Sequence, residues 1–146
     1  MVVEELADGR FAVRFERAFA HPAAKVWRAL TEQAHLRAWF VEILDYDRCR
    51  LDFAAGATLS FVATGDFPTG HGRVLACDPP HLLEYTWDTE ILRFELAEDG
   101  DTACLLRFTN IVDGRDTADA VAPGWSTGLD RLADVLAAGN AMSTVD

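Results

Sequence analysis

Hydrophobic and polar residues alternate near the beginning of the chain. Phe11, Val13 and Phe15 are apolar, whereas Arg14 and Glu16 are charged. A period of two is typical of a strand that buries one face, because successive side chains of a strand point to opposite sides. The pattern therefore predicts the first strand.

The apolar residues that follow have helical spacing. Trp27 and Leu30 lie one turn apart, the pattern breaks near residues 31–34, and it resumes toward Trp39. Pro22 suits the first turn of a helix, where a missing N–H costs nothing. We therefore expect two short helices in tandem after the first strand.

Short apolar segments separated by turn residues occupy residues 46–110. Strands are expected near residues 48–53, 58–62, 72–77 and 82–87, and turns at residues 88–89 and 98–101 close hairpins with two more strands. Six successive strands with short links predict an antiparallel meander, which brings the sheet to seven strands with the first one.

One apolar stripe marks the C-terminal segment and predicts an amphipathic helix over about residues 117–138. Gly139-Asn140 is the expected end of this helix. Pro123 either kinks the helix near its start or places its first turn at about Ala122. The stripe consists of Val121, Trp125, Leu129, Leu132 and Leu136.

The order of elements predicts an α+β fold in one domain that spans residues 1–146, with its core at about residues 11–138. A curved sheet of this size cannot fill its concave face with its own side chains, and a single long helix covers only part of that face. Some of the interior is therefore expected to remain open.

Charge and composition argue against several classes of binding partner. Acidic residues outnumber basic ones by 24 to 13, and the formal net charge of −11 argues against binding to nucleic acid or anionic lipid. No apolar run is long enough for membrane insertion, and no export signal precedes the first strand, so a cytoplasmic protein is expected. The three cysteines form no CxxC pair, the histidines have no metal-ligand spacing, and the glycines form no nucleotide-binding motif. We therefore expect no metal and no cofactor.

Several segments together resemble a known family. They are Phe15-Glu16-Arg17, residues 27–31, Leu36-Arg37-Ala38-Trp39-Phe40, residues 72–87 and Gly124-Trp125 with residues 129–132. In order and spacing they are similar to the SRPBCC superfamily, which has a START-like or Bet v I-like helix-grip fold, and within it to the branch named for the activator of heat-shock protein 90 ATPase. The resemblance implies a long C-terminal helix over an apolar cavity. It also implies a range of roles, from lipid carriers to polyketide cyclases.

Inward-facing positions of the predicted strands and helices supply the candidate cavity residues. His71, Arg73 and Leu75 share one face of a strand, so His71 and Arg73 point inward if Leu75 does. Arg73 would then bind an anionic head group or pair with Glu84 or Asp66, and the Tyr85 hydroxyl would orient a ligand or bond to the backbone. The full set is Trp39, Phe61, His71, Arg73, Tyr85, Trp87, Phe94, Phe108, Trp125 and Leu129.

Trp39 and Phe40 have two interpretations. They form either an aromatic gate at the cavity entrance or a hydrophobic anchor that docks the helix pair on the sheet. We favour the anchor.

Three functions fit the sequence. The first is a binding protein for a small hydrophobic or amphipathic ligand, which we favour. The second is a cyclase-like or hydrolase-like enzyme, with His71 weighed as a general base; we assign no catalytic residue. The third is an interaction domain similar to the chaperone activator. The protein is expected to be a monomer or a homodimer.

Overall fold

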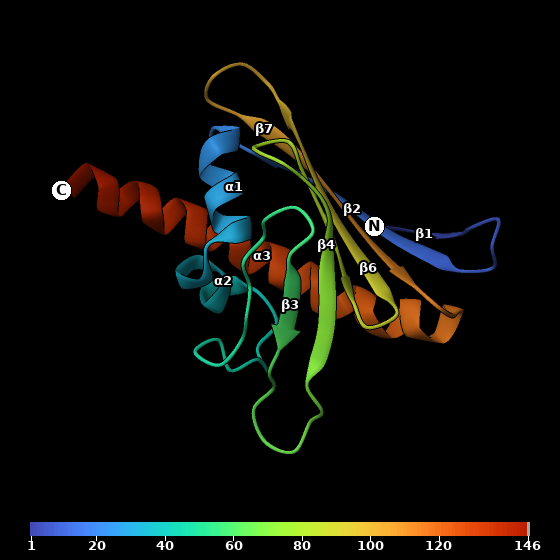
Figure 1. The fold of residues 1–146 in the computed structure, drawn as a ribbon. Coiled ribbons are helices and arrows are strands. Elements are labelled where there is room, and N and C mark those ends of the chain that lie inside the picture. The colour runs from blue at the N-terminus through green and yellow to red at the C-terminus, as the bar shows by residue number, and fades with distance from the viewer. Residues whose placement is uncertain (146) are drawn as a thin grey trace.

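A seven-stranded antiparallel sheet forms the body of the protein (Figure 1). The computed structural model describes the backbone of residues 1–145 and the side chains of residues 1–138. The strands lie side by side in the order β1-β2-β7-β6-β5-β4-β3, so β3 to β7 form a meander whose last strand pairs with β2. Their bounds are β1 (Val2–Glu5), β2 (Phe11–Phe19), β3 (Thr58–Phe61), β4 (Gly70–Asp78), β5 (Leu82–Trp87), β6 (Glu90–Glu98) and β7 (Cys104–Val112).

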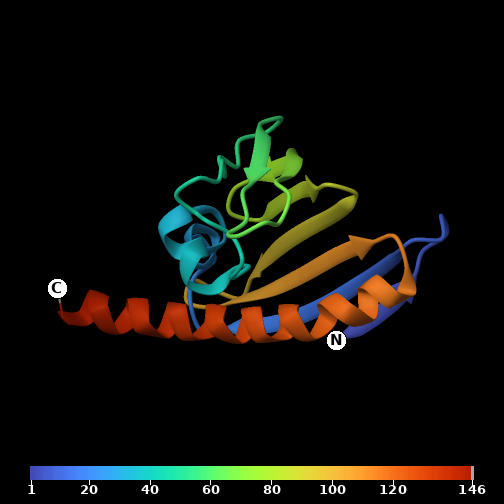
Figure 2. The ribbon, with the colours of Figure 1, turned by 90° about the horizontal axis from the view of Figure 1, so that it is seen from below.

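Three helices cover the concave side of the sheet. The short helices α1 (Ala23–Thr31) and α2 (Gln33–Trp39) are separated by Glu32, whose backbone is extended, and this confirms the predicted interruption. The long helix α3 (Arg115–Val145) runs beneath the sheet along β2 and β7 and also packs on α2 (Figure 2). The predicted α+β helix-grip architecture is confirmed.

The two faces of the sheet differ in chemistry. Cross-strand partners on the concave face are aromatic: Phe108 lies opposite both Phe15 and Phe94, with ring centroids 6.4 and 4.7 Å away. On the convex face, Arg107 pairs with Glu16 across β7 and β2 at 2.9 Å. The core therefore lies between the concave face and the helices.

The strand expected at residues 48–53 is not formed. Leu51 and Phe53 are buried while Asp52 is exposed, so the alternation is real. The backbone here pairs with β3 only through the isolated bridge between Arg50 and Ser60. The seventh strand is instead β1, which pairs with β2.

The last helix is longer than predicted. It begins at Arg115, so Pro123 lies inside it rather than in its first turn, and it continues through the expected stop at Gly139-Asn140 to Val145. Gly and Asn are weak helix formers but do not prevent helical backbone geometry. In the described part of the chain, no helix is long and apolar enough to cross a membrane.

Candidate ligand-binding cleft

A cleft of about 830 Å³ opens where the end of α2, the β5–β6 turn and the middle of α3 meet. Pockets that hold small organic molecules have volumes of roughly 300–1,000 Å³, so the cleft is large enough for such a ligand. Its lining residues are Trp39, Phe40, Val41, Glu42, Ile43, Trp87, Asp88, Thr89, Glu90, Leu92, Ala120, Val121, Pro123, Gly124, Trp125, Thr127, Gly128 and Arg131.

Aromatic rings form much of the cleft wall. The centroid of the Phe40 ring lies 6.2 Å from that of Trp87 and 5.7 Å from that of Trp125. Behind Trp87, Phe61 stacks with its centroid 4.0 Å away and its plane 4° from parallel. The rings are therefore held by neighbouring rings and offer a rigid apolar surface.

Trp39 fixes the helical end of the cleft. Its side chain is 1% exposed, and its indole N–H donates to the carbonyl oxygen of Ala29 in α1 at 2.7 Å. Its ring also meets Phe40 and Phe94 edge-on. These contacts are those of an anchor that docks α2 on α1 and the sheet.

The part of α3 that faces the cleft carries small residues. A Cβ atom added to Gly128 would lie 3.6 Å from the carbonyl oxygen of Trp39, so α3 passes close to the end of α2 there. A Cβ atom added to Gly124 would meet no atom within 4 Å apart from the neighbouring backbone of its own helix. Helix α3 thus forms one wall of the cleft without filling it.

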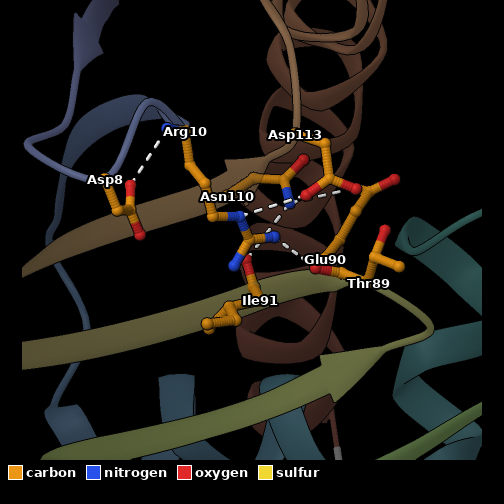
Figure 3. Close-up of polar contacts among 7 residues, drawn as sticks. All are labelled: Asp8, Arg10, Thr89, Glu90, Ile91, Asn110 and Asp113. Carbon is orange, nitrogen blue, oxygen red and sulfur yellow. Dashed lines mark hydrogen bonds and ion pairs between the residues drawn. The ribbon is translucent and has the colours of Figure 1, made fainter.

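Asn110, which is 0% exposed, organises the polar end of the cleft (Figure 3). Its Oδ1 accepts a hydrogen bond from the Trp125 indole N–H at 2.9 Å. Its Nδ2 donates to Glu90 Oε1 at 3.1 Å and to the Ile91 carbonyl oxygen at 3.2 Å. An indole N–H can only donate, so these bonds fix the orientation of the amide. Asn110 therefore positions Trp125 and Glu90 together.

Glu90 is half-buried and lines the cleft, and it shares its partner Asn110 with Trp125. Burial is the largest influence on this group and raises the pKa of the Glu90 carboxyl, an effect that the hydrogen bond from Asn110 opposes. Asp113 and Asp88 raise the pKa further, and Arg10 lowers it.

Arg10 ties together three turns next to Glu90 (Figure 3). Its Nε lies 3.2 Å from the carboxylate of Asp113, just before α3, and its guanidinium donates to the carbonyl oxygen of Thr89 in the β5–β6 turn. Its backbone N–H donates to Asp8 Oδ1 at 2.9 Å. Arg10 is thereby committed to holding the loops at this end of the cleft.

Arg131 lies six residues beyond Trp125 along α3 and also lines the cleft. Its guanidinium forms an ion pair with Glu42, which follows α2 in the chain. The positive charge of Arg131 is therefore balanced within the wall itself. Among the described residues, no group of three His, Cys, Asp or Glu side chains is arranged to hold a metal ion.

Residues 20–137 match the family model described as Activator of Hsp90 ATPase homolog 1-like protein. The chain belongs to this family. The resemblance inferred from the sequence is thus confirmed, whereas a search of curated proteins finds no match.

Solved structures of similar fold come from several bacteria. A conserved protein of unknown function from Enterococcus faecalis, EF2215, shares 27% identity over 92% of this chain and 75% of its own, with a TM-score of 0.74. Protein MLL2253 from Mesorhizobium loti shares 25% identity over 86% of this chain and 96% of its own, with a TM-score of 0.71. DynU16, described as a putative protein in the dynemicin biosynthetic locus, shares 22% identity over 88% of this chain and 48% of its own, with a TM-score of 0.72. The likeness to DynU16 concerns the fold alone.

The structure divides the predicted cavity residues into three groups: those that line the cleft, those buried in the core, and those on the outer face of the sheet. Trp39, Trp87 and Trp125 line the cleft. Five others are fully buried in the core: Phe61, Tyr85, Phe94, Phe108 and Leu129. The Tyr85 hydroxyl has no hydrogen-bond partner among the described residues, and burial raises the pKa of this phenol.

His71 and Arg73 are not in the inner wall. Leu75 is 50% exposed and Val74 is 1% exposed, so the face of β4 that carries His71, Arg73 and Leu75 points to solvent. The shared face was predicted correctly, but its direction was not. Placement of these two residues therefore offers no support for their proposed roles toward a ligand.

Sequence reasoning missed Glu90, Asn110 and Arg131. A signal for Asn110 was present, since it alternates with Phe108 and Val112 and so shares their buried face. A polar residue at such a position needs hydrogen-bond partners, which would have directed attention to the β5–β6 turn.

Proposed function

We propose that this protein binds a small, largely apolar molecule in the cleft between α3, the β5–β6 turn and the end of α2. The observation that carries the proposal is the cleft itself: about 830 Å³ of space bordered by Trp39, Phe40, Trp87 and Trp125. Apolar pockets with a few fixed polar groups are the usual form of small-molecule sites.

The rigidity of the walls supports binding. Trp125 is held by Asn110, Trp39 by Ala29 and Trp87 by Phe61. Rings that are already fixed lose little conformational freedom when a ligand packs against them, so more of the contact free energy appears as affinity. Family membership is consistent with this role, because the resemblance to the family implies an apolar cavity under the long C-terminal helix.

The binding role is better supported than a cyclase-like or hydrolase-like activity. Catalysis would need polar side chains that converge on one substrate. Arg131, the basic residue that lines the cleft, is already engaged in an ion pair with Glu42. None of the described residues that line the cleft is a histidine.

Filling the cleft tests the proposal. Ala120 is exposed on α3 and lines the cleft, so Ala120→Leu places a larger side chain in the ligand volume and also preserves helix propensity. The neutral, solvent-sensitive dye prodan is a suitable probe. We expect the wild type to bind prodan with an emission blue shift, and we expect A120L to weaken binding by about fivefold or more, equivalent to about 1 kcal/mol.

Ala133→Leu is the matched control, because Ala133 is exposed on the same helix outside the cleft. A133L should bind prodan as the wild type does, within about a factor of two. Equal weakening by both variants, or none by A120L, would place the dye elsewhere and contradict the proposal.

A further inference from the structure

We infer that the cleft selects ligands that carry a protonated amine, with the ammonium group bound at Glu90 and the apolar body against the aromatic walls. This inference rests on the binding function proposed above and adds the chemical class of the ligand. It is based on the charged side chains that line the cleft, because they leave a negative charge that no positive charge balances.

Acidic side chains dominate the cleft. Glu42, Asp88 and Glu90 line it, and the basic residue among the lining residues is Arg131. Arg131 is paired with Glu42, so neither presents a full charge to a ligand. The carboxylates of Asp88 and Glu90 remain, both at the β5–β6 turn.

The two remaining carboxylates are not equivalent. Asp88 Oδ1 accepts a hydrogen bond from the backbone N–H of His71 at 2.9 Å, and Asp88 is exposed. Glu90 is half-buried, and its Oε1 is held by the fully buried Asn110. A carboxylate that is partly shielded from water and fixed in place attracts a cation more strongly than a mobile exposed one. Glu90 is thus the stronger recognition group.

Arg10 is the basic residue near Glu90, but its ion-pair partner is a different carboxylate. Arg10 makes its ion pair with Asp113 and donates to the Thr89 carbonyl oxygen. Asp113 adds a further negative charge beside Glu90, as Figure 3 shows. The charged groups that act on Glu90 are therefore Arg10, which is positive, and Asp88 and Asp113, which are negative, so the site is net negative.

The aromatic walls favour the same sign of charge. The faces of Phe40, Trp87 and Trp125 are electron-rich and attract cations by their quadrupoles. Trp125 is linked to Glu90 through Asn110, so ring and carboxylate are held as one unit. A carboxylate ligand would be repelled by both features, whereas an aliphatic or aromatic amine is attracted by both.

Asn110 acts here as a positioning residue. It touches the ligand site only through Trp125 and Glu90, and its own side chain is fully buried. The inference therefore places recognition at Glu90 and assigns the geometry of that recognition to Asn110.

A matched set of three ligands tests the inference: 2-(2-naphthyl)ethylamine, 2-(2-naphthyl)ethanol and 3-(2-naphthyl)propionate. They share one apolar body and differ in charge. Competition against prodan at low salt and pH 7.5 should give the wild type an affinity for the amine about tenfold higher than for the alcohol, with the propionate weakest.

Glu90→Gln removes the charge and keeps an oxygen that accepts from Asn110. We expect E90Q to abolish the preference for the amine and to leave alcohol binding within about a factor of two. Glu16→Gln is the control, since Glu16 is an exposed member of a surface ion pair on the convex face; E16Q should keep the preference.

A pH series adds a second readout. Burial raises the pKa of Glu90, so the carboxylate takes up a proton at a higher pH than an ordinary glutamate does. As the pH is lowered, the preference for the amine should therefore begin to decline at a pH above the ordinary pKa of glutamate. In E90Q this pH dependence should disappear.

Failure of this inference differs from failure of the binding function. If the alcohol binds as tightly as the amine, or if E90Q weakens all three ligands equally, the cation specificity is wrong while binding in the cleft stands. If neither prodan nor any of the three ligands binds, both proposals are overturned.

Discussion

Gly72 lies where β4 and β5 approach each other too closely for a side chain. A Cβ atom at this position would sit 1.8 Å from the carbonyl oxygen of Thr86 and 3.2 Å from a ring carbon of Phe61. Because the nearest atom belongs to the backbone, no rotamer change relieves the clash, and the two strands must separate. Gly72→Ala is therefore expected to lower the free energy of unfolding by about 2–4 kcal/mol, measured by urea denaturation.

Gly124→Ala provides the contrasting glycine. It is exposed on α3, where a Cβ atom would meet no atom within 4 Å apart from the neighbouring backbone of its own helix. Alanine has the higher helix propensity, so G124A should stabilise the protein by up to about 1 kcal/mol. If G72A were as stable as the wild type, the close approach of β4 and β5 would not be a constraint on the fold.

At the scale of elements, Pro123 is the unusual feature of α3. Proline has no N–H, so the carbonyl oxygen of Asp119, four residues earlier, lacks its helical donor. Pro123→Ala restores that donor and the helix propensity. We expect the free energy of unfolding to rise by about 1–3 kcal/mol in urea denaturation.

Thr127→Ala measures how much stability is gained from helix propensity alone, without a restored hydrogen bond. Thr127 is also exposed on α3 and lines the cleft, but it already has an N–H. Its replacement should add only about 0.5 kcal/mol, the difference in propensity alone. A P123A variant that gains no more than T127A would show that the missing hydrogen bond is satisfied in another way.

The sequence pattern predicted elements well where burial and backbone pairing coincide. The first strand, the break between α1 and α2 and the meander are such cases. At residues 48–53 they do not coincide: Leu51 and Phe53 are buried in alternation, yet only Arg50 pairs with β3. Strand β1 is the converse, because it pairs fully with β2 while its residues are mostly exposed. A pattern of side chains cannot report hydrogen bonds to a neighbouring strand.

At the scale of the whole molecule, the sequence was enough to expect a cleft but not to predict its position. The period of two correctly placed His71, Arg73 and Leu75 on one face, but the direction of that face depends on what packs against β4. Likewise, Phe94 and Phe108 are buried as predicted, yet they stack on each other in the core instead of lining the cleft. Which inward residues border a cavity is decided by how the others fill the interior.

The net charge of −11 is a property of the whole surface and affects its stability. Self-repulsion of an unbalanced charge acts over long distances and is screened by salt, whereas exposed ion pairs such as Arg107–Glu16 contribute only about 0–1 kcal/mol each. We therefore expect repulsion to outweigh the pairs. The melting temperature should rise by roughly 2–5 °C between 20 and 500 mM NaCl at pH 7.5, measured by calorimetry.

A variant of lower charge tests whether repulsion is the cause. Asp52, Asp66 and Asp101 are exposed in loops, and replacing all three by Asn removes three charges from −11 and leaves −8. This variant should melt at a higher temperature in 20 mM NaCl and should gain less from added salt, because less repulsion remains to be screened. A melting temperature that falls with salt in the wild type would mean that the ion pairs across the convex face outweigh the net charge.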